Sequence, residues 1–217
     1  MKKLLHLSII KTIWFNLKYF RLRDALRFPV LVSRRVKLDK MEGEITLPSN
    51  IKMGMIKIGF DGVGIFDSRY SRAIWSVSGK VNFQGNCTFG QGSKISVGKN
   101  GYLTLGNNFI ITAESSIVCH LKITFGDDVL ISWDNLFMDT DFHHIYNNNE
   151  KINTDKEINI GNNVWIGVRN VILKGTSIAS NTIVGGNSLI NKKFKHENVL
   201  LAGQPAQIKK TDLTWKA

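Results

Sequence analysis

The sequence predicts an all-β protein whose main domain is a parallel β-helix built from repeats of six residues. Aliphatic residues recur at every sixth position over residues 160–190, and glycine follows several of them. A period of six fits neither an α-helix nor one long strand, but it fits short strands joined by tight turns, three to a triangular coil. The aliphatic residues of this run are Ile160, Ile166, Ile172, Ile178, Val184 and Ile190.

Each repeat is expected to point one aliphatic side chain inward, stacked on its equivalent in the next coil. No coil buries its apolar stripe alone, so stacking drives the fold. A second position, four residues after the aliphatic residue of each repeat, is mostly occupied by a small or polar residue. The same six-residue step appears less regularly earlier in the chain, from Leu105 to Ile117 and again from Phe125 to Phe137.

A long insertion interrupts the repeats before Ile160. The 35 residues from Phe125 to Ile160 exceed one coil by about 17, and a solenoid accommodates such an excess as a loop leaving one corner. We place this loop at about residues 139–157. Loops on a rigid scaffold commonly carry functional residues, and this one contains Asp139, Asp141, His143 and His144.

The chain is expected to have three parts: a basic amphipathic segment at 1–50, the β-helix at 51–200 and an extension at 201–217. The first part should form one or two amphipathic helices, because its apolar residues lie near helical spacing. Such a helix could dock on an anionic membrane or cover the open first coil. Its apolar positions are Leu4, Leu7, Ile10, Trp14, Leu17 and Leu22.

Charge is concentrated at the beginning of the chain. The net charge is +12, and residues 1–40 hold eleven Lys and Arg against two Asp. The body therefore lacks the basic groove expected of a nucleic-acid-binding protein. The two cysteines, Cys87 and Cys119, have no metal-ligand or redox spacing. Without a membrane span or a signal-peptide pattern, a cytoplasmic protein is expected.

Four signals in order resemble the hexapeptide-repeat acyltransferases. They are the repeats of 160–190, the segment 139–145 (Asp-Thr-Asp-Phe-His-His-Ile), the turn Val164–Gly167 and the segment Ala202–Ala206. The resemblance covers about residues 95–210 and is closest to the maltose and galactoside O-acetyltransferases and their capsule and exopolysaccharide relatives. It implies a left-handed β-helix, a homotrimer with active sites between subunits, acetyl-CoA as acyl donor and a carbohydrate acceptor, with no metal.

The resemblance also implies a catalytic histidine. An acetyl thioester is already activated, so the enzyme must orient a hydroxyl and remove its proton, for which histidine is suited. In the maltose-type motif the histidine follows a threonine by three residues, which Thr140 and His143 match. His144 is the second candidate, and Asp139 or Asp141 could orient the ring.

Further positions match the acetyl-CoA groove of the family. Trp165 is expected beside the histidine or as a packing residue, and small residues permit close approach of the pantetheine arm. The coil at 112–116 lacks the asparagine with which sugar-specific relatives contact the acceptor, so the acceptor is left open. The expected groove residues are Trp165, Gly167, Gly185, Gly186, Ser188, Lys192, Pro205, Lys209 and Lys210.

The leading hypothesis is an O-acetyltransferase for a surface polysaccharide or its lipid-linked precursor, with residues 1–40 contacting the inner face of the membrane. The alternatives are an N-acetyltransferase for an amino-sugar or amino-acid acceptor, and a β-helix that binds without catalysis. The sequence leaves open the acetylated position and the length of the acyl group.

Overall fold

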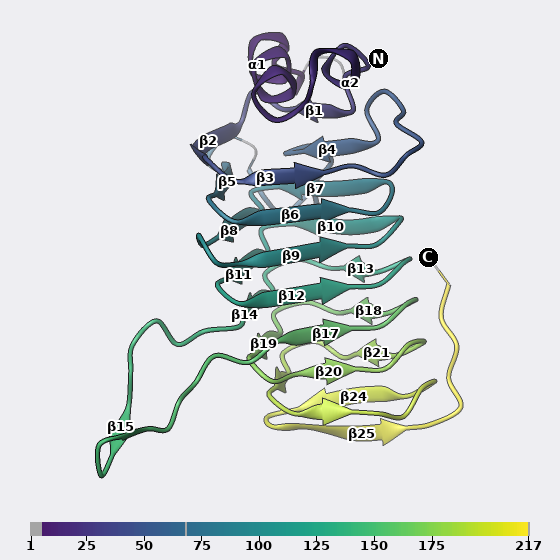
Figure 1. Ribbon diagram of the computed structural model, residues 1–217. Coiled ribbons are helices and arrows are strands. Elements are labelled where there is room, and N and C mark those ends of the chain that lie inside the picture. Colours follow the sequence, from purple (N-terminus) through teal and green to yellow (C-terminus); the bar gives the residue numbers. More distant parts are fainter. Residues whose placement is uncertain (1–5, 68, 217) are drawn as a thin grey trace.

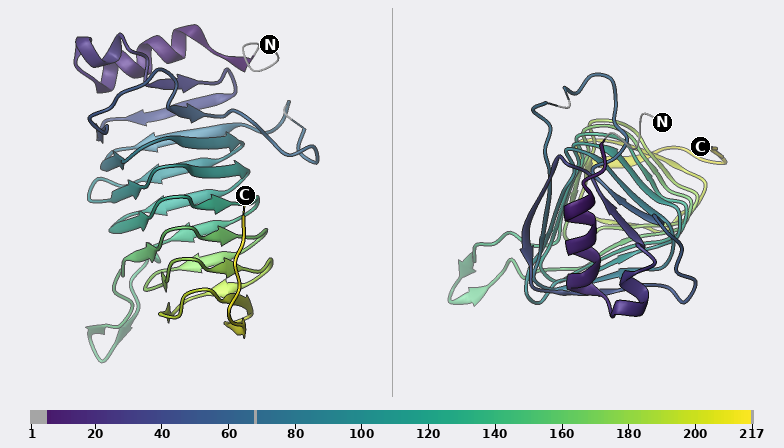
Figure 2. Two further views of the ribbon diagram at one scale, coloured as in Figure 1. Left: turned by 90° about the vertical axis from the view of Figure 1, so that its right-hand side faces the viewer. Right: turned by 90° about the horizontal axis from the view of Figure 1, so that it is seen from above.

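The computed structural model describes residues 6–67 and 69–216. Three parallel sheets form the sides of a long prism, and each turn of the chain adds one strand to each sheet (Figure 1). Seen along its axis, the prism is triangular (Figure 2). The predicted parallel β-helix is therefore confirmed.

The strands of the three sheets are named here in their order along the prism. The first sheet contains β1 (Val30–Val32), β4 (Ile56–Ile58), β7 (Cys87–Gln91), β10 (Phe109–Ala113), β13 (Leu130–Ile131), β18 (Trp165–Ile166), β21 (Ile183–Val184), β24 (Leu200–Gly203) and β25 (Ala206–Lys210). The second contains β2 (Val36–Met41), β5 (Ala73–Val77), β8 (Lys94–Val97), β11 (Ser116–Cys119), β14 (Leu136–Met138), β19 (Val171–Leu173) and β22 (Leu189–Ile190). The third contains β3 (Glu44–Thr46), β6 (Lys80–Phe83), β9 (Tyr102–Leu105), β12 (Lys122–Phe125), β17 (Ile158–Ile160), β20 (Ser177–Ile178) and β23 (Lys193–Phe194).

The register of the last coils matches the six-residue period. Ile160 pairs with Ile178, Ile166 with Val184, and Ile172 with Ile190, so each residue meets its partner 18 positions later. All six side chains are buried, with exposed fractions of at most 3%. The inward stack predicted from the repeats is thus present.

The first coils are longer and begin earlier than the expected boundary at residue 51. Strands β1, β2 and β3 already belong to the three sheets, and Val30 and Val32 are fully buried. Val30 pairs with Ile56, 26 residues on, and Cys87 with Phe109, 22 residues on. Because these coils differ in length, their strands show no fixed six-residue period.

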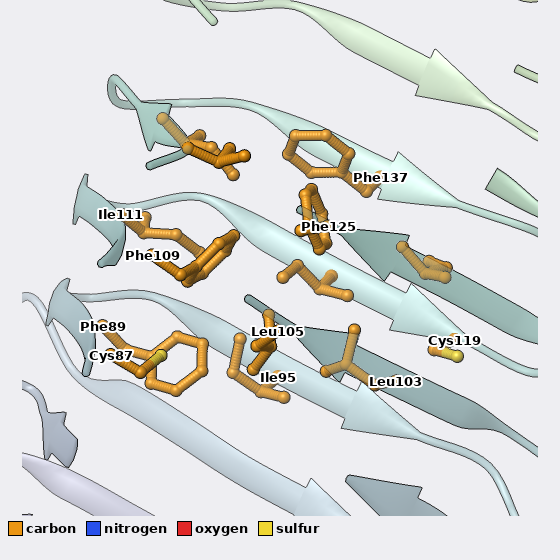
Figure 3. Packing of buried hydrophobic residues seen from close by; sticks show 14 of the residues in the cluster. Cys87, Phe89, Ile95, Leu103, Leu105, Phe109, Ile111, Cys119, Phe125 and Phe137 are labelled. Atoms are coloured by element: carbon orange, nitrogen blue, oxygen red, sulfur yellow. The ribbon is translucent and has the colours of Figure 1, made fainter. Parts of the chain in front are cut away.

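A column of aromatic rings runs through the core of the prism, and Figure 3 shows four of them, Phe89, Phe109, Phe125 and Phe137. Trp75 contacts Phe89, which contacts Phe109, with ring centroids 6.1 and 5.9 Å apart. Phe109, Phe125 and Phe137 continue the column at 4.9 and 5.1 Å. All five rings are fully buried. Tilted and edge-to-face rings at these distances stabilise a core beyond the apolar area that they bury.

Buried polar side chains connect the coils at the corner between the first and second sheets. We call Ser115, Asn135, Asn170 and Ser188 the corner ladder. The Oδ1 of Asn135 accepts from the backbone N–H of Asn170 at 2.9 Å, and the Oδ1 of Asn170 accepts from that of Ser188 at 2.8 Å. The Nδ2 of Asn170 donates to the carbonyl of Gly167 at 3.0 Å. Backbone groups that the corner would leave unpaired are thereby satisfied.

Replacing Asn170 with alanine is expected to lower the free energy of unfolding by about 2–4 kcal/mol, because a buried N–H and a buried C=O lose their partners. Urea unfolding followed by circular dichroism measures the change. Asn159→Ala, on the exposed side of β17, is the matched control and should have little effect. Equal stabilities of the two variants would contradict the role of the corner ladder.

Two helices cover the first coil: α1 (Ile9–Tyr19), with Ser8 as its N-cap, and α2 (Leu22–Ala25). Side chains of α1 satisfy the outer edge of β1. Asn16 donates to the carbonyl of Val30 at 2.7 Å and accepts from its N–H at 3.2 Å, while Thr12 accepts from the N–H of Val32 at 3.0 Å. The helix therefore closes the edge by side-chain hydrogen bonds. Of the expected apolar positions in this segment, Leu4 lies outside the described residues.

At the other end, β25 pairs antiparallel with β24. The chain then turns back and runs along the outside of the prism toward its middle (Figure 1). The N–H of Leu213 donates to the carbonyl of Asn198 at 2.9 Å, and the indole Nε1 of Trp215 donates to the carbonyl of Asn163 at 2.9 Å. We call residues 211–216 the return segment.

Candidate active site

The chain leaves the prism between β14 and β17, at the corner between the second and third sheets. Most of this excursion is exposed, and a short antiparallel hairpin, β15 (Tyr146–Asn147) with β16 (Glu150–Lys151), forms its tip. Both views in Figure 2 show it projecting well away from the body. A segment of this kind can reach a neighbouring molecule while its base stays fixed to the scaffold.

Asp139 anchors the base of the loop and is fully buried. Its two carboxylate oxygens accept from the backbone N–H groups of His120, Leu121 and Lys122 at 2.7–2.9 Å. Burial, with the nearby charge of Asp139, raises the pKa of the Cys119 thiol to about 12. The Asp139 carboxylate, one of the two groups that could orient a histidine ring, thus binds the backbone of the preceding coil.

Asp141 lies at the centre of a second network that holds the two arms of the loop together. Its Oδ2 accepts from the Nζ of Lys174 at 2.6 Å and from the Nδ2 of Asn153 at 2.9 Å. The Lys174 ammonium also donates to the carbonyl of Asn153 at 2.9 Å. These hydrogen bonds hold the pKa of Asp141 below its usual range, with Lys174 as the main cause and Asn153 second.

His143 and His144 both lie in the exposed part of the loop. The backbone on each side of His143 is fixed, because its N–H donates to the carbonyl of Asp141 at 2.6 Å and its carbonyl accepts from the Nδ2 of Asn153 at 2.8 Å. Its side chain is left facing solvent. His144 instead makes an edge-to-face contact with Tyr146 of the hairpin, with centroids 6.3 Å apart.

The sequence did not identify three residues that contribute to this corner: Asn153, Lys174 and His120. The ring of His120 contacts Phe142 edge-to-face at 4.7 Å and so supports the loop from the preceding coil. Lys174 follows β19, which pairs with β14 through Met138 and Leu173. This pairing places Lys174 beside the start of the loop. The contact between Lys174 and the loop could have been predicted only if the pairing of the two coils had been known.

The lowered pKa of Asp141 predicts how the loop responds to acid. A carboxylate with a folded-state pKa below its unfolded value, about 3.9, contributes stability above that value and loses it as pH falls through the folded pKa. We expect the protection factors for amide hydrogen exchange in residues 139–157, which are corrected for the pH dependence of the intrinsic exchange rate, to be steady from pH 7 to about 4 and to fall below it. Lys174→Met should accelerate exchange already at pH 7. Unchanged exchange in this variant, with the coils at 160–190 as internal control, would contradict the network.

Trp165 lies on a different side of the prism. It projects outward from β18 in the first sheet, with 37% of its surface exposed. Its Nε1 donates to the Oγ of Ser132 at 3.3 Å, and its ring lies 6.1 Å from that of Trp215 in the return segment. Within one chain this tryptophan therefore packs against the return segment, with the second sheet between it and the corner that bears His143.

The predicted small residues of the groove lie at the corner after the first sheet. A Cβ at Gly167 would meet the carbonyl of Val184 at 2.8 Å, and one at Gly186 would meet Val168 at 3.2 Å. A Cβ at Gly185 would lie 3.2 Å from the Cβ of Ala202. Close stacking of the coils therefore requires glycine at position 167 and leaves little room for a side chain at positions 185 and 186. Ser188 belongs to the corner ladder, where its hydroxyl donates to the carbonyl of Gly185 and accepts from the N–H of Gly203.

The last coil carries a basic surface. A cavity of about 440 Å³ lies there, and its lining includes Lys192, two further lysines and Phe194. The Nζ of Lys192 lies 5.4 Å from the centre of the Phe194 ring. Lys209 and Lys210, at the end of β25, and Pro205, in the turn before it, are all exposed. A surface of this charge suits phosphate groups.

The predicted residues thus form three groups in one chain: the loop with Asp141 and His143, the first-sheet side with Trp165 and its glycines, and the basic last coil. Among residues 6–67 and 69–216, no group of three or more His, Cys, Asp or Glu is arranged to hold a metal ion. In the same part of the chain, no helix has the length and hydropathy to span a bilayer.

Comparison with known proteins finds relatives among the O-acetyltransferases. The chain is 40% identical over 114 residues to a polysialic acid O-acetyltransferase of Neisseria meningitidis, covering 52% of this chain and 51% of that protein. It is 35% identical over 122 residues to a galactoside O-acetyltransferase of Escherichia coli (strain K12), covering 55% of each. The chain thus spans about half the length of these relatives. No protein-family profile matches it.

Two solved structures resemble the fold. The polySia specific acetyltransferase NeuO superposes with a TM-score of 0.56 at 21% identity, over 87% of this chain and 79% of that one. A galactoside acetyltransferase in complex with coenzyme A superposes with a TM-score of 0.50 at 28% identity, over 61% of this chain and 64% of that one. Its three-sided coils and its superposition on these two structures show that the chain has the left-handed β-helix fold, and its sequence is similar to acetyltransferases built from hexapeptide repeats.

Proposed function

We propose that the chain is an acetyl-CoA-dependent O-acetyltransferase that acts on a sugar hydroxyl of a surface polysaccharide or its precursor. The observation that carries the proposal is the projecting loop, which bears His143 on a backbone fixed by Asp141, Asn153 and Lys174. The similarity to enzymes named for O-acetylation of polysialic acid and galactosides supports an oxygen acceptor in a sugar.

The chemistry needs a base and a fixed geometry. His143 takes the proton of the sugar hydroxyl while the hydroxyl oxygen attacks the thioester carbonyl carbon. The tetrahedral intermediate then collapses, the carbon–sulfur bond breaks, and the imidazolium returns the proton to the departing sulfur. The products are an acetate ester and the CoA thiol. Asn153 and Asp141 act as positioning residues, since they hold the backbone around His143.

The donor is acetyl-CoA, in line with the coenzyme A complex of the structural neighbour. The basic cavity with Lys192, together with Lys209 and Lys210, would take its phosphate groups. Trp165 would cover the pantetheine arm. Ser188 and the glycines near it would shape the wall of the groove through the close stacking of coils.

We propose a homotrimer as the working assembly. The loop with His143 and the Trp165 side of the prism lie on different faces of one chain, so a second copy must bring them together. A cyclic arrangement repeats this contact three times around a closed ring. Sedimentation velocity should give a trimer, and mixing His143→Ala with Trp165→Ala subunits should restore part of the lost activity at shared sites.

We further propose that the enzyme works in the cytoplasm at the inner face of the membrane, where lipid-linked polysaccharide precursors are built. The basic residues 1–40 support this location. The polysaccharide itself is identified only by its class, a carbohydrate with a free hydroxyl.

Incubation with acetyl-CoA and repeat units of the host's polysaccharides tests the reaction. We expect a product heavier by one acetyl group, which mild base removes because it is an ester. A base-stable product would instead be an amide and would identify an N-acetyltransferase. Absence of acetylated product, together with no CoA release, would leave a β-helix that binds without catalysis and would overturn the proposal.

A further inference from the structure

The helix α1 presents its apolar face to solvent. Ile9, Ile10, Ile13, Trp14 and Leu17 are each at least 41% exposed. The face turned toward the prism carries Thr12 and Asn16, which bind the edge of β1, and the fully buried ring of Phe15. A helix that only covered a protein core would bury its apolar side chains in this way and would not leave five more of them exposed on its other face.

The second helix extends this apolar surface. Leu22 and Leu26, at its start and just after its end, are more than 60% exposed. Both helices lie across the end of the prism (Figure 2). We call the seven exposed side chains the cap face: Ile9, Ile10, Ile13, Trp14, Leu17, Leu22 and Leu26. Contiguous exposed apolar side chains of this size mark an interaction surface.

Cations border the cap face. Lys18, Arg21, Arg23 and Arg27 are exposed beside it, and Asp24 is the single acidic residue in the sequence from His6 to Phe28. A second copy of the chain docked end to end would bring these cations against each other, which is unfavourable. An anionic surface would instead attract them.

We propose that the cap face docks on an anionic lipid bilayer, with α1 lying in the plane of the interface and its apolar side chains among the upper acyl chains. Apolar residues with tryptophan on one side and Lys and Arg at the border are the composition of interfacial helices. A cyclic trimer about an axis along the prism carries its three cap faces at the same end, which multiplies a weak contact. The inference deepens the proposed function, on which it rests for its biological meaning, by naming the surface at which the enzyme works.

Vesicle flotation with the full chain tests the proposal. We expect binding to vesicles of phosphatidylglycerol and phosphatidylcholine in equal parts, weaker binding at high salt, and little binding to phosphatidylcholine alone. Trp14→Phe should still bind but lose part of the blue shift in tryptophan fluorescence. The double variant Ile10→Glu, Trp14→Glu should bind at least about tenfold more weakly. These side chains are exposed, so the thermal unfolding midpoint should not change.

Ile152→Glu is the matched control. It makes the same apolar-to-acidic change at a side chain that is 60% exposed, far from the cap face, and it should bind vesicles like the unmodified chain. Equal binding of the double variant and the control, or no binding by the unmodified chain, would overturn the proposal. A change of oligomeric state in the double variant by light scattering would also overturn it, because the cap face would then join copies. None of these readouts depends on acetyl transfer, so failure here is distinct from failure of the proposed function.

Discussion

His143→Ala is expected to lower kcat/KM for acetyl transfer by about 10²–10⁴-fold, the usual contribution of a general base. The structure gives the reason for choosing this residue: its backbone is fixed on both sides while its ring faces solvent. A base must be held in place and also be accessible to the acceptor. Steady-state kinetics with a saturating sugar acceptor measure the loss.

His144→Ala is the matched control. His144 contacts Tyr146 within the hairpin, and we expect its loss to change kcat/KM only a few-fold. If the large loss appeared in His144→Ala and not in His143→Ala, the assignment would be reversed. Asn153→Ala should lower kcat as well. Because this variant removes a positioning residue and keeps the base, the shape of its pH–rate profile should match that of the unmodified chain.

Phe125→Ala is expected to lower the free energy of unfolding by about 3–5 kcal/mol, the largest effect on stability that we predict. The ring lies between Phe109 and Phe137, at 4.9 and 5.1 Å, and is fully buried. Its removal leaves a cavity that rigid neighbouring coils cannot fill. Each coil is stabilised mainly by its neighbours, so unfolding should also become less cooperative in urea.

Phe142→Ala serves as the control for Phe125→Ala. Phe142 is 54% exposed and contacts only His120 among the aromatic rings of the described residues. We expect a loss of less than about 1 kcal/mol from it. Similar losses from both variants would mean that the aromatic column contributes no more than a surface contact.

The six-residue period predicted the regular half of the prism from sequence alone. Ile160, Ile166 and Ile172 are buried and pair with the residues 18 positions later, as the repeats required. The small and polar second position turned out to contain part of the corner ladder. The structural role of this position could not be predicted from the sequence. Asn170 forms its hydrogen bonds with backbone groups, and the identity of a residue does not show where its backbone groups lie.

The first coils were harder to predict for a physical reason. Their strands are paired over 20 to 37 residues, because the segments between the strands vary in length. A six-residue period can be recognised in a sequence only where no insertions separate the strands of a coil. The polar contacts of α1 with β1 were equally hidden, since Thr12 and Asn16 are spaced like any polar residues of an amphipathic helix.

Within the candidate site, the sequence predicted the loop and its histidines but could not separate the two aspartates. Asp139 and Asp141 are two residues apart, yet one is buried on three backbone N–H groups and the other joins Lys174 and Asn153. Their difference depends on which coil each meets. That depends in turn on the pairing of β14 with β11 and with β19, between residues 20 and 35 positions apart.

The two edge strands of the first sheet determine whether the stack of coils can grow by pairing with other molecules. A stack of identical rungs could in principle lengthen without limit by adding strands from other molecules, as fibres do. Here Asn16 and Thr12 occupy the free edge of β1, while β25 runs in the direction opposite to β24, so a rung added beyond it could not continue the parallel stack. On this side of the prism, both ends of the stack therefore disfavour growth into filaments by the addition of further parallel rungs.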